Sequence, residues 1–139
     1  MKKIVIVGAL GYLGTELCKI YSGESWRNKI VALDNRFLSD RVSQLNSWNI
    51  EFFQGHILDN NFLKKHLFDA DIVHHLAGVT DVAYVKTEAN SELDERIRSI
   101  AIDGTNNILK NISPNCKIIF PSTHVVFEGY QETKKDIDE

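Results

Sequence analysis

A glycine-rich turn near the start of the chain sets the strongest limit on what it can fold into. An unbroken apolar run, Ile4–Val7, stops at Gly8, and Gly11 and Gly14 follow at three-residue intervals. Such a run is typical of a strand buried on both faces. Apolar residues then recur at helical spacing from 13 to 21. The pattern predicts a strand, a tight turn and a helix that packs closely on that strand.

Apolar runs and amphipathic stretches continue to alternate along the chain. Further strands are predicted at 30–33, 50–53, 71–76 and 117–120, and further helices at 59–68, capped by Asp59, and at 88–111. The long helix is expected to have its apolar residues on one side, namely Leu93, Ile97, Ile100, Ala101, Ile108 and Leu109. Alternating strands and helices favour right-handed crossovers and a parallel sheet. We therefore expect one doubly wound, three-layer αβα domain over residues 1–139 with strand order 3-2-1-4-5.

An acid at the end of the second predicted strand extends the glycine pattern into a ligand-binding pattern. Asp34 lies twenty residues beyond Gly14. Gly11 would let the backbone approach a pyrophosphate, the helix start would offer free N–H groups, and Asp34 would accept hydrogen bonds from ribose hydroxyls. The pattern predicts a dinucleotide site. The alternatives are a glycine-rich turn in another kind of doubly wound protein, and a surface turn acid at Asp34.

Composition excludes several other classes of function. Sixteen Lys and Arg against nineteen Asp and Glu give a net charge of −3, so nucleic acid is not an expected partner. No apolar run approaches the roughly 18 residues of a membrane span. Cys18 and Cys116 form neither a metal-ligand pair nor a disulfide framework, and free thiols favour a cytoplasmic location. His74 and His75 have no Asp, Glu or Cys near them at the spacing of metal ligands, so no metal is expected.

Three more segments accompany the glycine turn, whose spacing is GxxGxxG. They are VHHLAG at 73–78, DGTNN at 103–107 and PSTHVVFEG at 121–129. In this order the four segments resemble the extended branch of the short-chain dehydrogenase/reductase superfamily, the NAD-dependent nucleotide-sugar epimerases, dehydratases and reductases. The last segment is similar to that of dTDP-4-dehydrorhamnose reductases. The resemblance implies a Rossmann-like fold, NAD as cofactor and a nucleotide-sugar substrate. NAD is expected rather than NADP because Asp34 would repel a 2′-phosphate, an effect that Arg36 could partly offset.

The glycine pattern and the resemblance together define the expected site. The residues expected at the cofactor are Gly8, Gly11, Tyr12, Leu13, Gly14, Asp34, Asn35, His56, Ile57, Leu76, Ala77 and Gly78. Thr123 takes the position of the family's catalytic hydroxyl. Two positions depart from the family pattern. His56 stands where an acid often lies near the adenine, and Ala101 stands where the family has Asn.

The family's catalytic Tyr-xxx-Lys motif has one match, Tyr130 to Lys134. Tyr130 follows Thr123 by only seven residues, which leaves no room for the helix that carries the motif in the family, so we interpret the match as coincidence. The motif and most of the substrate lobe are then expected beyond Glu139. The chain is expected to be the N-terminal, cofactor-binding part of a longer enzyme and to be inactive alone.

Two functions from different classes follow from these residues. The first is an enzyme that acts on a nucleotide sugar. The second is a stand-alone NAD(P)-binding module, such as a redox-sensing regulator without catalysis. The segment from Ser122 to Gly129 favours the enzyme, because a sensor has no need of it. A homodimer is compatible with the resemblance.

Overall fold

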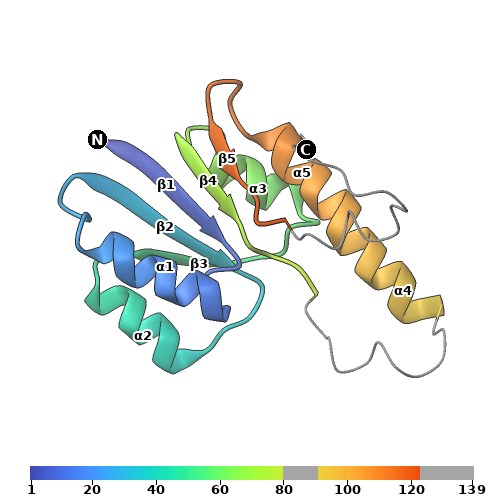
Figure 1. Ribbon diagram of the computed structural model, residues 1–139, viewed down its shortest axis with the longest axis horizontal. Helices are drawn as coiled ribbons and strands as arrows, with labels where there is room; N and C mark the ends of the chain where they lie inside the picture. The colour runs from blue at the N-terminus through green and yellow to red at the C-terminus, as the bar shows by residue number, and fades with distance from the viewer. Residues whose placement is uncertain (80–90, 123–139) are drawn as a thin grey trace, which may run out of the picture.

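The computed structural model describes residues 1–79 and 91–122, with no account of the side chains of 91–94 (Figure 1). Five parallel strands form one sheet in the order β3-β2-β1-β4-β5, as predicted. The strands are β1 (Lys2–Val7), β2 (Asn28–Asp34), β3 (Glu51–Gln54), β4 (Ile72–His75) and β5 (Lys117–Ile119). The strand order reverses beside β1, which lies at the centre of the sheet and pairs with both β2 and β4.

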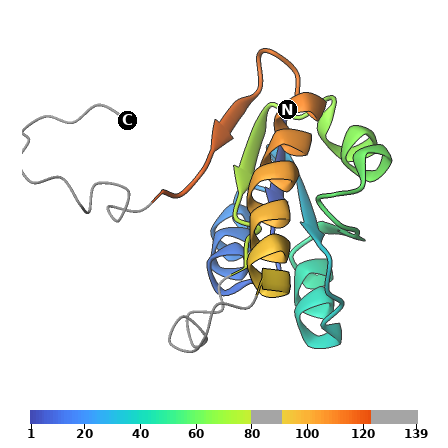
Figure 2. The same cartoon turned by 90° about the vertical axis from the view of Figure 1, so that its right-hand side faces the viewer.

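Helices cover both faces of the sheet, which confirms the three-layer architecture (Figures 1 and 2). The helices are α1 (Tyr12–Ser22), α2 (Ser39–Ser47), α3 (Asn60–Leu67), α4 (Ser91–Arg98), the π-helical η2 (Ser99–Gly104) and α5 (Thr105–Asn111). The last three follow one another without interruption and form a single rod. None of the helices in the described ranges combines the length and the apolar character that a membrane crossing requires.

The core consists of two apolar clusters separated by the sheet. Successive side chains of a strand point to opposite faces. Ile4 and Ile6 of β1 therefore join the cluster under α1 and α2, which includes Cys18, whereas Val5 and Val7 join the cluster under α3 and α5. All five of these side chains are fully or almost fully buried. The unbroken apolar run of β1 thus reflects burial on both faces.

A capping side chain marks the start of α3 but not the start of α2. The Asp59 carboxylate accepts a hydrogen bond from the Phe62 amide at 3.0 Å and caps α3, as predicted. Helix α2 was not predicted. It has only Val42 and Leu45 as apolar residues and begins after Leu38, which supplies no capping side chain.

The rod from α4 to α5 confirms the predicted long helix over its described part, but the predicted apolar side is wrong at Ile97, Ala101 and Leu109. Ile97 and Leu109 are exposed, whereas Gly104 and Ile108 are buried and Ile100 is half-buried. In an α-helix, residues four apart drift by about 40° around the axis at each step. The wider i→i+5 turn of η2 offsets this drift and holds Ile100, Gly104 and Ile108 toward the sheet.

Three histidines of the described segments are buried. His66 packs between two rings, with its ring centroid 4.3 Å from that of Phe53 and 4.8 Å from that of Phe62. His74 and His75 point to opposite faces of β4, as predicted. The His74 Nε2 atom lies 2.9 Å from the Tyr21 hydroxyl, and the His75 Nε2 atom lies 2.9 Å from the Thr105 hydroxyl. Burial is the main cause that lowers the pKa of each of the three.

These histidines predict that the fold loses stability in mild acid. Each stays neutral in the folded chain below about pH 6.5, where it takes up a proton in the unfolded chain. The free energy of unfolding should therefore fall as the pH drops from about 7 toward 5, by at most about 1.4 kcal/mol per pH unit for each histidine. Urea unfolding at several pH values measures this. His66→Leu should make the dependence shallower, and an unchanged unfolding free energy over this range would contradict the prediction.

Candidate functional site

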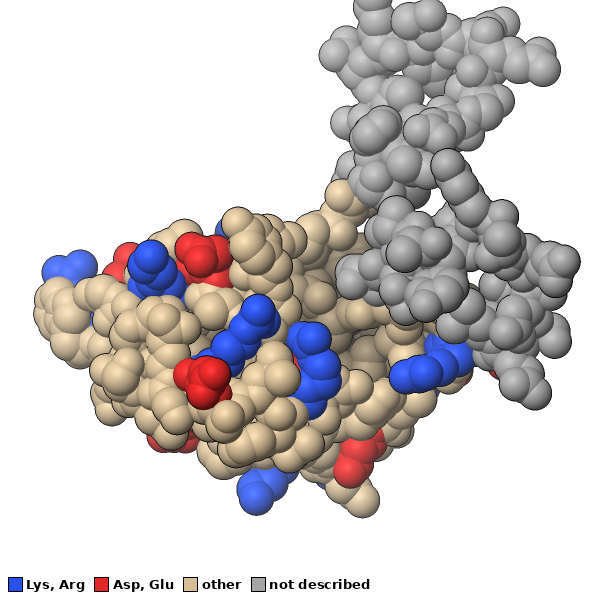
Figure 3. Space-filling view, turned by 90° about the horizontal axis from the view of Figure 1, so that it is seen from below, with Lys and Arg blue, Asp and Glu red and all other residues tan. Residues whose placement is uncertain are grey.

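A cleft of about 770 Å³ opens at the carboxyl ends of the central strands, beside the point where the strand order reverses. Its volume lies within the range of about 300–1,000 Å³ that small-molecule sites occupy. In parallel α/β sheets, ligands bind at this edge. Figure 3 views the molecule from this side and shows Lys and Arg side chains beside a hollow in the surface.

All of the residues predicted from the sequence to bind a cofactor lie on the wall of this one cleft. They are Gly8, Gly11, Tyr12, Leu13, Gly14, Asp34, Asn35, His56, Ile57, Leu76, Ala77 and Gly78. They come from the turn after β1, the ends of β2 and β3, and the segment after β4. The fold therefore brings together residues that are up to seventy positions apart in the chain.

The floor of the cleft is bare backbone. Gly8 has a φ of 87°, and a Cβ atom there would lie 2.8 Å from the Ala77 amide nitrogen. A Cβ atom at Gly14 would lie 2.3 Å from the Gly8 carbonyl oxygen. Both separations are too short for any side chain. Glycine at these two positions lets β1, α1 and the segment after β4 approach one another at the cleft.

Helix α1 begins at the cleft with its N-terminal amides uncapped. Its N-cap is Gly11, no side chain caps this end, and its first turn has no acid. The first N–H groups of a helix have no partner within it. The Thr15 hydroxyl points back and donates to the Gly11 carbonyl at 2.8 Å, so it does not compete for these amides. The end of α1 can therefore receive an anion from the cleft.

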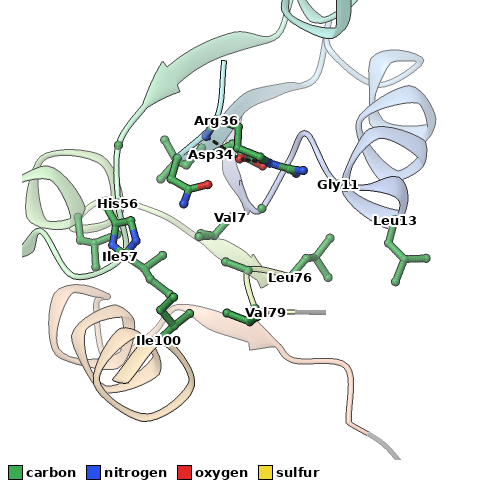
Figure 4. Close-up of a pocket in the computed structure, with 18 of the residues that line it drawn as sticks. Val7, Gly11, Leu13, Asp34, Arg36, His56, Ile57, Leu76, Val79 and Ile100 are labelled. Carbon is green, nitrogen blue, oxygen red and sulfur yellow. Dashed lines mark hydrogen bonds and ion pairs between the residues drawn. The ribbon is translucent and has the colours of Figure 1, made fainter. Parts of the chain in front are cut away.

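Asp34, at the end of β2, is only 5 % exposed and is held by its own chain. Its Oδ2 accepts from the Leu10 amide at 2.9 Å, and its Oδ1 accepts from the Arg36 amide and side-chain Nε at 3.0 and 3.2 Å (Figure 4). A carboxylate offers about four lone-pair positions. Three are taken, which leaves about one for a ligand hydroxyl.

The wall across the cleft from helix α1 comes from the end of β3. The Gly55 amide donates to the Asp34 carbonyl at 2.9 Å, and His56 and Ile57 follow directly. The His56 Nδ1 atom accepts from the Leu58 amide at 3.1 Å. Figure 4 shows His56 and Ile57 across the cleft from Gly11 and Leu13. The cleft therefore runs from the amide end of α1, past Asp34, to His56.

Two arginines of the cleft wall were not found by sequence reasoning. Arg41 lies in α2, the helix that the sequence did not reveal, and donates to the Leu10 carbonyl. Arg96 lies in α4, one turn before Ile100, and it reaches the cleft because of how the rod is rotated about its own axis. With Arg36, the wall holds three guanidinium groups against one described carboxylate, Asp34. The cleft is suited to an anionic ligand.

The predicted catalytic group lies beyond the described part of the chain. Thr123, Tyr130 and Lys134 all fall in 123–139, outside the described residues. Pro121, two positions before Thr123, lines the cleft. The assignment of Thr123 therefore stays a prediction.

The cysteines contribute no reactive group to this cleft. Burial raises the pKa of the Cys18 thiol to about 12, and burial also raises the pKa of Cys116. Within 1–79 and 91–122, no three His, Cys, Asp or Glu side chains are grouped so that they could hold a metal ion.

A parallel sheet in this order, with a bare glycine turn at its switch point, defines a Rossmann-like fold of the short-chain dehydrogenase/reductase type. The model of the 3-beta hydroxysteroid dehydrogenase/isomerase family matches residues 5–139, and the chain belongs to this family. This confirms the resemblance seen in the four sequence segments.

Curated relatives match part of their own length. Uncharacterized protein 052L of Frog virus 3 is 30 % identical over 112 residues, which cover 78 % of this chain and 29 % of that protein. The dTDP-D-glucose 4,6-dehydratase of Dictyostelium discoideum is 34 % identical over 90 residues, which cover 59 % of this chain and 20 % of that enzyme. The chain thus spans less than a third of the length of either relative.

Solved structures share the fold. The PbgP3 protein of Burkholderia pseudomallei superposes with a TM-score of 0.74 at 24 % identity, over 97 % of this chain and 39 % of that one. The ADP-L-glycero-D-manno-heptose-6-epimerase of Helicobacter pylori gives 0.71 at 22 % identity, over 97 % and 43 %. The UDP-glucose-4-epimerase of Stenotrophomonas maltophila, solved with bound NAD, gives 0.71 at 17 % identity, over 91 % and 38 %.

The glycine floor predicts that a Gly→Ala substitution lowers the stability of the fold at Gly14, in the first turn of α1, but not at Gly23, the C-cap of the same helix. Gly14→Ala places a methyl group against the Gly8 carbonyl and should destabilise the fold by about 1–3 kcal/mol. Gly23→Ala is the control, because φ there is −66° and the nearest atom to its Cβ lies at 3.6 Å. This change should be neutral or stabilising by up to about 1 kcal/mol. Urea unfolding compares the two, and equal stabilities would contradict the proposed contact.

Proposed function

We propose that this chain binds NAD in the cleft and is the cofactor-binding part of an epimerase, dehydratase or reductase that acts on a nucleotide sugar. One observation carries the proposal: a single cleft joins the uncapped end of α1, the buried acid Asp34 and the wall formed by His56 and Ile57, in the order that a dinucleotide needs. Family membership and a curated relative named as a dTDP-D-glucose dehydratase support it.

The residues present fit such a cofactor along its length. The pyrophosphate would meet the amide end of α1 at Gly11 to Leu13, where no Cβ of Gly11 or Gly14 intervenes. The adenosine ribose would use the free acceptor position of Asp34. The base would lie against His56 and Ile57. The remaining half would extend along the segment after β4, toward Pro121.

When bound, NAD supplies the chemistry of such enzymes by accepting a hydride from a sugar carbon. The chain's own contribution is to bind and orient the cofactor. The end of α1 and the guanidinium groups of Arg41 and Arg96 would offset the charge of the two phosphates, whereas Arg36 pairs with Asp34. In our proposal, the hydroxyl of Thr123 would contact the substrate. Several solved neighbours carry NAD, including the Brucella ovis UDP-glucose 4-epimerase, which supports the choice of cofactor.

We expect NAD to bind more tightly than NADP, because a 2′-phosphate would approach the Asp34 carboxylate. Arg36 pairs with Asp34 at 3.2 Å and limits this preference. Asp34→Asn keeps the shape of the side chain and removes its charge. It should therefore lower the ratio of the NADP Kd to the NAD Kd by about fivefold or more. Arg36→Gln removes the cation that neutralises Asp34 and should raise the ratio of the NADP Kd to the NAD Kd. Isothermal titration with both cofactors measures the ratio. Equal affinities in the unmodified chain would contradict the preference.

We expect residues 1–139 to show no turnover with NAD and a panel of UDP-sugars, dTDP-glucose and a 3β-hydroxysteroid. A positioned acid/base contributes about 10²–10⁴ in rate, and our interpretation places that group outside this chain. Chromatography of the sugar and steroid products detects turnover in which the hydride is returned, and absorbance of reduced nicotinamide detects net oxidation. Turnover that Tyr130→Phe abolishes would show that Tyr130 and Lys134 are the functional pair. Turnover that survives this change would contradict the interpretation of the chain as the cofactor-binding part.

A further inference from the structure

His56 lies where the cleft meets the end of β3, next to the ribose position at Asp34. The neighbouring strands are tied at this point. The Gly55 amide donates to the Asp34 carbonyl at 2.9 Å, and the Gln54 side-chain amide donates to the Asn35 carbonyl at 3.2 Å. His56 follows directly and lines the cleft. A ligand whose ribose reaches Asp34 therefore brings its base to His56.

The hydrogen bond inside this loop fixes which hydrogen-bonding group His56 offers. The Leu58 amide donates to His56 Nδ1 at 3.1 Å, so Nδ1 carries no proton. A neutral imidazole has one protonated nitrogen, and its proton is then on Nε2. The side chain is half-buried, and its second nitrogen is a hydrogen-bond donor. A carboxylate at this position would be an acceptor only.

The loop that carries His56 is anchored to the helical rod that packs against it, at the end of η2 and at α5. The Ile57 carbonyl accepts from the Asn107 side-chain amide of α5 at 3.2 Å. The Ile57 side chain is buried against Gly104, where a Cβ atom would lie 2.3 Å from Ile57 Cδ1. A donor on an anchored loop can select between ligands, because its direction is set before the ligand arrives.

We propose that His56 makes the base subsite of this cleft a donor site, which selects bases that present an acceptor at that edge. This inference rests on the proposed function, since it requires a dinucleotide in the cleft. Adenine presents an amino donor at position 6 between two ring-nitrogen acceptors, whereas a 6-oxopurine presents a carbonyl acceptor at position 6. We therefore expect the cleft to bind a hypoxanthine dinucleotide at least as tightly as NAD.

The test compares NAD with nicotinamide hypoxanthine dinucleotide by isothermal titration. The readout is the ratio of the hypoxanthine Kd to the adenine Kd. In the unmodified chain we expect a ratio of about one or less. His56→Asp keeps an acceptor for the Leu58 amide and replaces the donor by an acceptor, and it should raise the ratio about fivefold or more, the effect of one hydrogen bond exchanged for a repulsion.

Two controls isolate the donor. His56→Asn also keeps an acceptor for the Leu58 amide and still has an N–H donor, so the ratio should stay within about twofold of the unmodified chain. Asn61→Asp adds the same charge on the exposed start of α3 and should also leave the ratio unchanged.

The outcomes separate this inference from the proposed function. Failure of both dinucleotides to bind the unmodified chain would overturn both. Tight binding of NAD with a ratio well above one in the unmodified chain, or a ratio that His56→Asp does not move, would overturn the role of His56 alone. An equal rise in His56→Asn and His56→Asp would also overturn it, because the loss of the imidazole, and not the change from donor to acceptor, would then be the cause.

Discussion

The contact of backbone with backbone at the end of β1 is the constraint on which the rest of the structure depends. Gly8 approaches the segment after β4, and Gly14 approaches Gly8, at distances that exclude any side chain. This contact sets how closely α1 packs on the sheet and where its first amides point. It also leaves the floor of the cleft without side chains. The absence of side chains at Gly8 and Gly14 therefore has two effects. It lets the backbone segments pack closely, and it leaves room for a ligand in the cleft.

Asp34 shows how a ligand-facing group is held in place before a ligand arrives. A buried carboxylate is costly unless it is hydrogen-bonded and paired. Leu10 and Arg36 supply the donors, and Arg41 holds the Leu10 carbonyl from α2. The glycine turn, β2 and α2 are thus joined through one acid and two guanidinium groups. These hydrogen bonds offset the cost of burying the Asp34 carboxylate. They also occupy most of its lone pairs, so that about one remains for a ligand.

The sequence revealed those parts of the fold whose signal is local. The run Ile4–Val7 revealed the central strand, because burial on both faces requires continuous apolar residues, and Asp59 revealed the start of α3. Helix α2 escaped notice because Val42 and Leu45 give it too narrow an apolar side. The apolar side of the rod was predicted only in part, because the extra width of η2 arises from hydrogen bonding, which no spacing of residues displays. Arg41 and Arg96 were missed as a direct result, since each depends on one of these helices for its place in the cleft. The glycine turn and Asp34 needed no such information, because each lies at the end of a strand.

The contact between Ile57 and Gly104 means that two distant positions share one volume. The loop after β3 and the end of η2 are separated by nearly fifty residues, yet the isoleucine occupies the space that a side chain at 104 would need. A larger residue at 104 is compatible with this fold only if residue 57 becomes smaller, and neither change alone keeps the loop and the helix in place. Among chains that share this architecture, these two positions should therefore vary together in size, so that the residue at the end of η2 limits which residue can form this part of the cleft wall.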